Sequence, residues 1–249
     1  MFRTSDRAEP FGINFTPMIP ASVVGQSETH LCEPGDAAWL TVSVHRDVVD
    51  PFRALKEAAA SSGFDVAILS GFRGFDRQLS IWNRKAAGEL AVLDFNARPL
   101  DIASLTEREL VFAILRWSAL PGASRHHWGT DIDVYDASAR PEGYEIELVP
   151  SEYEGEGMFA PFSEWLDARI ADGTSFGFFR PYDRDRGGIA PERWHLSHGP
   201  LAAEFASTLT IELLRDTVMS ADMLLKDVVL SNLEEIMDRF VKNTNPEVP

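Results

Sequence analysis

Four of the six histidines in this 249-residue chain stand in two tight groups, each with a carboxylate close by in sequence. In the first group, His126 and His127 are followed, after Gly129, by Asp131 and Asp133. A histidine in a loop and an aspartate on the next strand bring a nitrogen and an oxygen to one point, and glycine permits the turn between them. The first group therefore offers part of a metal site.

The second group offers a third nitrogen ligand, His195, with Glu192 three residues before it and His198 three residues after it. Positions three apart face opposite sides of a strand, so Glu192 and His195 need a bend or a helical turn to cooperate. Two histidines and one aspartate leave a tetrahedral zinc ion one open position for water, as catalytic zinc sites do. Glu192 is then placed to accept a proton from that water.

Other hydrolytic chemistries lack their residues in this sequence. No lysine has a serine three residues before it, so a Ser-x-x-Lys nucleophile is absent, and neither Gly-x-Ser-x-Gly nor His-Glu-x-x-His occurs. The phosphate-binding Gly-x-x-x-x-Gly-Lys loop is missing as well. Metal-assisted hydrolysis is the reaction class that remains.

Three blocks of sequence together resemble the signature of the LAS metallopeptidases, which comprise lysostaphin-type enzymes, D-Ala-D-Ala metallopeptidases and the hedgehog domain. The blocks are SGFRGFDRQ at 70–78, SRHHWGTDID at 124–133 and ERWH at 192–195. The first is similar to the Ser-Gly-Tyr-Arg-Ser-x-x-x-Gln segment of the VanY-like D-alanyl-D-alanine carboxypeptidase branch. The resemblance runs from about residue 70 to 199, roughly half of the chain.

The resemblance implies a role for seven residues. These are His126, Asp133 and His195 as zinc ligands, Glu192 as general base, and Arg73, Gln78 and Ser124 as contacts to a substrate carboxylate or to the oxyanion of the reaction. Two positions depart from the family pattern: Phe72 replaces the usual tyrosine, and Asp131 stands where alanine is common. Because Asp131 shares a strand face with Asp133, it either supports a ligand or alters the ligand set.

Composition excludes several classes of protein. Hydrophobic residues make up 45% of the chain and charged residues 25%, as in globular proteins. The formal net charge of -16 repels nucleic acid and anionic lipid, and the single cysteine, Cys32, excludes an intramolecular disulfide. No membrane-spanning or signal-like apolar stretch is visible, which predicts a cytoplasmic protein as given, or one of the cell envelope if a leader was removed.

Hydrophobic patterning predicts an α+β fold, in which a small antiparallel sheet carries the zinc site between helices. Predicted strands cover 40–44, 66–69, 130–135 and 144–149; predicted helices start at Asp50 and cover 75–88, 106–118 and 161–171, with a helical extension over 200–242. We expect one peptidase domain over 1–249, with an irregular lead-in at 1–37, a catalytic core at about 70–199 and the C-terminal helices after it.

The sequence thus predicts zinc-dependent hydrolysis of peptides ending in D-Ala, such as a peptidoglycan stem peptide, with Arg73 holding the terminal carboxylate or the oxyanion. Three alternatives stay open: a cell-wall endopeptidase or a dipeptidase using the same zinc site, and a zinc-dependent binding module without turnover. The roles of His127 and His198 are also open. His127 is either a packing residue or a support for a ligand, and His198 either stabilises the reaction intermediate or orients a ligand, or has no role in the site.

Overall fold

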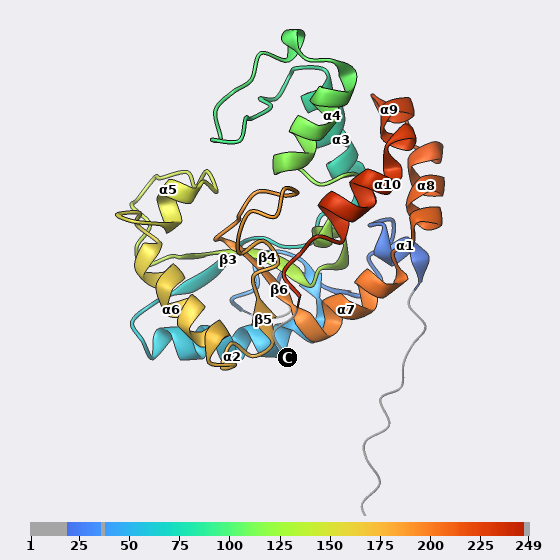
Figure 1. Ribbon diagram of the computed structural model, residues 1–249. Helices are drawn as coiled ribbons and strands as arrows, with labels where there is room; N and C mark the ends of the chain where they lie inside the picture. Colours follow the sequence, from blue (N-terminus) through green and yellow to red (C-terminus); the bar gives the residue numbers. More distant parts are fainter. Residues whose placement is uncertain (1–18, 36–37, 247–249) are drawn as a thin grey trace, which may run out of the picture.

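The computed structural model describes residues 19–35 and 38–246. Figure 1 shows a central sheet with helices on both sides. The strands are β1 (Leu31–Cys32), β2 (Val44–His45), β3 (Val66–Ser70), β4 (Asp131–Asp136), β5 (Phe178–Phe179) and β6 (His195–His198). The α-helices are α1 (Pro20–Val23), α2 (Val49–Ala60), α3 (Phe75–Ala86), α4 (Glu107–Trp117), α5 (Pro150–Tyr153), α6 (Ala160–Ala171), α7 (Gly199–Thr208), α8 (Ile211–Ser220), α9 (Lys226–Ser231) and α10 (Leu233–Ile236). Short 3-10 turns occur at Arg46–Val48, Ile102–Ser104 and Arg125–Trp128, and a π-helical turn, Met237–Val241, follows α10.

The main sheet is antiparallel throughout, with strands in the order β3-β4-β6-β5, while β1 and β2 form a separate pair. Ile132 and Val134 of β4 belong to a core that includes Phe52 of α2 and Phe162 of α6. Because side chains alternate along a strand, the intervening Asp131 and Asp133 face the other side of the sheet. The apolar face of β4 therefore packs into the core, and its acidic face, with Asp131 and Asp133, lies on the opposite side of the sheet.

The predicted α+β fold with a small antiparallel sheet is confirmed. The apolar run 66–69 forms β3, the alternating segment 130–135 forms β4, and the helices expected at 75–88 and 161–171 are α3 and α6. The helix predicted at 106–118 is α4, and it starts with a capping box, in which the side chains of Thr106 and Glu109 each accept a hydrogen bond from the other's backbone N–H. The helix expected from Asp50 begins one residue earlier, at Val49.

The strand predicted at 144–149 is wrong, and a buried carboxylate supplies the reason. Glu152 is 3% exposed, and its two oxygens accept hydrogen bonds from the backbone N–H groups of Glu147 and Val149 and from the Tyr144 hydroxyl. These N–H groups are therefore not available to a neighbouring strand. Leu148 also has a positive φ of 56°, which interrupts an extended chain.

The strand predicted at 40–44 is also largely wrong, because only Val44 pairs, within β2. The carbonyl of Ser43 instead accepts a hydrogen bond from the N–H of Phe72, so this segment runs against the turn that follows β3. The irregular lead-in expected at 1–37 lies partly outside the described residues, and its described part contains α1 and β1. The proposed division into lead-in, catalytic core and C-terminal helices remains a prediction.

The C-terminal helices α7 to α10 share one apolar core with α3, α4 and the turn Arg125–Trp128. Trp82 of α3 donates its indole N–H to the carbonyl of Leu224, and the side chain of Asn83 bonds to both Asp222 and Leu224. These contacts fix α3, which begins five residues after β3. Among the described residues, no helix has the length and apolar character needed to cross a bilayer.

Gly129 makes the turn between the Arg125–Trp128 segment and β4. Its φ of 68° lies in the left-handed region, and a Cβ there would stand 2.7 Å from the backbone nitrogen of His45. Its carbonyl accepts a hydrogen bond from that same nitrogen at 2.8 Å. The close approach of β2 therefore requires glycine at this position.

We expect Gly129→Ala to lower the free energy of unfolding by about 2–5 kcal/mol, the sum of a left-handed alanine and a backbone overlap. Gly143 is the matched control, because its φ is 75° and a Cβ would meet no atom within 4 Å. Gly143→Ala should therefore cost only about 1–2 kcal/mol. Chemical denaturation of the three proteins measures both values, and equal losses in the two variants would contradict the close-contact argument.

Candidate active site

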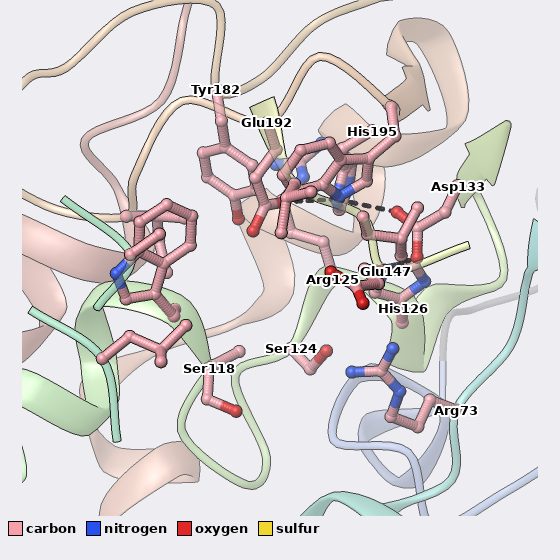
Figure 2. A pocket seen from close by; sticks show the side chains of 18 of the residues that line it. Arg73, Ser118, Ser124, Arg125, His126, Asp133, Glu147, Tyr182, Glu192 and His195 are labelled. Atoms are coloured by element: carbon pink, nitrogen blue, oxygen red, sulfur yellow. Dashed lines mark hydrogen bonds and ion pairs between the residues drawn. The ribbon is translucent and has the colours of Figure 1, made fainter. Parts of the chain in front are cut away.

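His126, Asp133 and His195 come from three elements and converge on one point, as Figure 2 shows. His126 lies in the turn before β4, and Asp133 and His195 are direct partners across the β4–β6 ladder. Each of the three offers one ligand atom, and these atoms all lie within 4.8 Å of one another. His126 Nε2 is 3.4 Å from Asp133 Oδ2, and His195 Nδ1 is 3.6 Å from Asp133 Oδ1.

The donor set fits a zinc ion. Two atoms that each bind a tetrahedral zinc at about 2.0–2.1 Å stand about 3.4 Å apart, close to the observed separations. Asp133 is 3% exposed, and within residues 19–35 and 38–246 its buried Oδ1 has no hydrogen-bond partner. A buried carboxylate oxygen without a donor is costly unless a cation satisfies it. His126 donates from Nδ1 to the carbonyl of Gly71 at 2.9 Å, which leaves the Nε2 lone pair toward Asp133.

Asp131 holds the opposite nitrogen of His195. Its Oδ1 accepts hydrogen bonds from His195 Nε2 at 3.0 Å and from Arg125 Nε at 2.7 Å, and its Oδ2 accepts from Thr130 and Ser197. Asp131 is fully buried. Burial alone would raise the pKa of Asp131, but the Arg125 guanidinium and His195 hold that pKa well below its usual range. The structure thus places Asp131, one of the two departures from the family pattern, behind the candidate ligand His195. There it fixes the imidazole ring so that Nδ1 faces Asp133.

Glu192 reaches His195 through a turn. The N–H of His195 donates to the Glu192 carbonyl at 3.3 Å, and Glu192 Oε2 lies 3.0 Å from His195 Nδ1. This is the bend that the three-residue spacing required. Burial by itself would lower the pKa of His195, but hydrogen bonds with Asp131 and Glu192 raise it. The surrounding carboxylates therefore favour a positive charge at this point, which a metal ion supplies as well as a proton does.

Arg73 follows the β3 strand and lines the same pocket as the three candidate ligands. Its backbone is held by the His126 carbonyl, and its guanidinium donates to Gln78 Oε1 at 3.1 Å and, more weakly, to Ser70 Oγ at 3.4 Å. Both partners are neutral. Gln78 is fully buried, and its amide also donates to the Ala119 carbonyl at 2.7 Å. The structure therefore places Gln78 behind Arg73, holding it, and outside the set of pocket-lining residues.

Of the other residues singled out in the sequence, Ser124 lines the pocket, while His127 and His198 do not. Ser124 lines the pocket close to Arg73 and His126 (Figure 2). His127 is fully buried, accepts from the Gly122 N–H and donates to the Arg73 carbonyl, so it supports the backbone of Arg73. Burial lowers the pKa of His127 to about 3, which keeps its ring neutral. His198 packs against the Phe178 ring and does not line the pocket.

Three pocket residues were missed by sequence reasoning. Arg125 stands at a variable position of the motif, and only the fold shows that it pairs with Asp131. Tyr182 packs its ring edge-on at 5.1 Å from His195, and Figure 2 shows its hydroxyl directed into the pocket beside Glu192. Burial raises the pKa of Tyr182, so the phenol keeps its proton as a donor. Lys85 lines the same cavity from α3. No sequence motif marks Tyr182 or Lys85.

The family model for VanY D-alanyl-D-alanine carboxypeptidase matches residues 41–201, more than half of the 249-residue chain. The chain therefore belongs to the VanY D-alanyl-D-alanine carboxypeptidase family, and the resemblance stated from its motifs is confirmed. It is a peptidase, of a metallopeptidase type. The match includes every one of the seven residues to which the resemblance gave a role.

Individual proteins similar to this chain share a third or less of the aligned residues in the following three cases. An uncharacterized protein of Haemophilus influenzae is 32% identical over 124 residues, which is 49% of this chain and 92% of that protein. The structure of VanYB in complex with D-alanine-D-alanine is 20% identical, covers 77% of this chain and 91% of that one, and has a TM-score of 0.46. The structure of the LdcB LD-carboxypeptidase is also 20% identical, covers 77% of this chain and 79% of that one, and has a TM-score of 0.47. At these TM-scores neither structure adds to the family assignment.

We expect purified protein to bind about one zinc ion per chain, and His126→Ala or His195→Ala to lose most of it, since each removes one of three ligands. Asp131→Asn removes charge behind His195 and should weaken zinc binding by a factor of about 10–100. His198→Ala, on the same strand as His195, is the control and should keep its zinc. Elemental analysis and competition with a chelator measure these values; normal zinc in both ligand variants would reject the assignment.

Proposed function

We propose that this chain is a zinc-dependent carboxypeptidase that removes the last residue of peptides ending in D-Ala, such as peptidoglycan stem peptides. One observation carries the proposal. The guanidinium of Arg73 lines the pocket beside the candidate metal ligands and, within the described residues, forms no ion pair. A charged group placed in this way is suited to an anion of the substrate.

His126, Asp133 and His195 would hold the ion. When bound there, zinc would supply Lewis acidity toward the scissile carbonyl and toward the attacking water. The Glu192 carboxylate lies beside the candidate ligands, with Oε2 3.0 Å from His195 Nδ1. From this position Glu192 accepts a proton from the attacking water and returns it to the leaving amine. Tyr182 lies next to Glu192 in the pocket and offers a neutral hydroxyl donor to the developing negative charge.

Arg73 is proposed to hold the free C-terminal carboxylate of the substrate. Burial lowers the pKa of Arg73, while the charges of Asp133 and Glu192 favour its protonated form. Gln78 fixes the guanidinium from behind, and Ser124 lies on the same side of the pocket. A guanidinium held in this way can donate two parallel hydrogen bonds to one carboxylate. An endopeptidase or a dipeptidase would use the same zinc site with different recognition of the substrate ends.

We expect Glu192→Gln to retain its zinc and to lose turnover by a factor on the order of 100 or more, because an amide keeps the shape but cannot accept a proton. The measurements are zinc content and the rate of D-Ala release from a short D-Ala-D-Ala peptide. Loss of zinc from this variant would make Glu192 a ligand instead of a base. A normal rate would place the base elsewhere, and a protein with bound zinc but no turnover on any peptide would favour the binding module.

We expect amidation of the terminal D-Ala to reduce kcat/KM by an amount equivalent to about 2–5 kcal/mol, because it leaves the Arg73 guanidinium without its partner. Arg73→Lys should lose most of its preference for the free acid, since a point charge cannot reproduce the planar fork. Turnover of the paired free-acid and amide peptides by wild type and variant gives the comparison. Equal wild-type rates on the two peptides would instead support cleavage inside the chain.

A further inference from the structure

Lys85 lines the same cavity as the candidate metal site, and no carboxylate neutralises it. The cavity has a volume of about 250 Å³, and its wall also includes the uncharged Leu93, Ala97, Trp117 and Ser118. The exposed carboxylate of Glu147 lines the cavity as well, but forms no ion pair with Lys85. Within residues 19–35 and 38–246, the Lys85 ammonium makes no hydrogen bond or ion pair. Burial lowers the pKa of Lys85. An ammonium in this environment gains from an incoming anion, because it has lost part of its hydration.

We propose that Lys85 forms a second anion subsite, which binds a carboxylate carried by the acyl part of the peptide, upstream of the scissile bond. This inference rests on the proposed carboxypeptidase function and specifies its substrate class: a peptide with an acidic residue a few positions before its free C-terminus. The first carboxylate would be held by Arg73 and the second by Lys85.

The helix α3 indicates the approximate spacing between the two subsites, because it carries Lys85 and the residue that holds Arg73. Gln78, which holds Arg73, and Lys85 are seven residues apart on this helix, so they lie on the same face about 10 Å apart along its axis. An extended peptide advances about 3.3 Å per residue, so this distance corresponds to about three residues. With the terminal residue at Arg73, the second carboxylate belongs about three residues earlier, and the length of the lysine side chain extends the range to positions two to four.

The net charge of the chain and the pairing of the other cavity cation both support an anion subsite at Lys85. The chain carries a formal net charge of -16, which repels an acidic peptide at long range. Arg125 also lines the cavity, but its charge is paired with the fully buried Asp131 at 2.7 Å. Among the described residues, Arg73 and Lys85 are therefore the arginine and lysine side chains of the cavity wall that form no ion pair. Two fixed anions on the peptide would match these two cations.

The loops around this part of the cavity are held in unusual backbone conformations. Ala97 and Leu148 both line the cavity and both have a positive φ, 59° and 56° respectively. Backbone strain of this kind gathers at ligand-binding sites. The Trp117 indole donates to the carbonyl of Asp94, which ties one of these loops to α4. These two loops therefore contribute fixed backbone positions to the wall of the cavity.

The test uses acetylated peptides that end in D-Ala-D-Ala, with glycine at the preceding positions except for one glutamate or glutamine two, three or four residues before the terminus. Wild-type enzyme should prefer glutamate over glutamine about tenfold in kcat/KM at one of these positions, mainly through KM, as one charge-assisted hydrogen bond contributes. Lys85→Met, which keeps the apolar stem, should bring this ratio close to one. Lys85→Glu should invert it.

Arg84→Met is the matched control, because Arg84 precedes Lys85 on α3, is exposed and pairs with Glu89. It removes the same charge from nearly the same place and should leave the glutamate preference intact. An equal loss in the Arg84 variant would show a general field effect and overturn the subsite. Cleavage of all peptides without any glutamate preference would overturn this inference alone. Failure to cleave any of them would overturn the proposed function, and this inference with it.

Discussion

The antiparallel register of β4 and β6 is the constraint on which the site depends. It sets Asp133 opposite His195 and Asp131 opposite Ser197, two steps along the same acidic face. A shift of one residue would turn both aspartates into the apolar core beneath the sheet, where Ile132 and Val134 now lie. The core on one face of β4 therefore fixes the ligand geometry on the other.

The buried charges of the site differ in how they are compensated. Asp131 is paired with Arg125 and bonded to His195, so its charge is satisfied by the protein itself. Asp133 has one buried oxygen, Oδ1, that receives no hydrogen bond from the described residues, and a bound cation would compensate its negative charge. In the described part of the chain, the Arg73 guanidinium has neutral hydrogen-bond partners alone, so its charge is free to pair with an anion. The protein thus leaves uncompensated the groups that ion and substrate would complete.

The helices remote from the sheet serve the site by holding α3. Trp82 and Asn83 tie this helix to the segment between α8 and α9, and the apolar core of α3, α4 and the C-terminal helices surrounds these bonds. Gln78 and Lys85 project from the same helix, so the position of both depends on that packing. The C-terminal helices therefore pack against the helix that carries Gln78 and Lys85, so they support the position of both proposed substrate subsites.

The sequence by itself determined the α+β class, the main helices, β3 and β4, because their patterns are local and periodic. Its histidine and carboxylate clusters indicated a metal site, and the resemblance of its motifs to the LAS metallopeptidases implied the group His126, Asp133 and His195, which the fold brings together. It could not place 144–149, where a single buried carboxylate from α5 takes the N–H groups that a strand would use. Nor could it show the pairing of Arg125 with Asp131 or the approach of Tyr182 and Lys85 to the pocket, since these contacts join elements far apart in sequence and only the packing of the chain decides them.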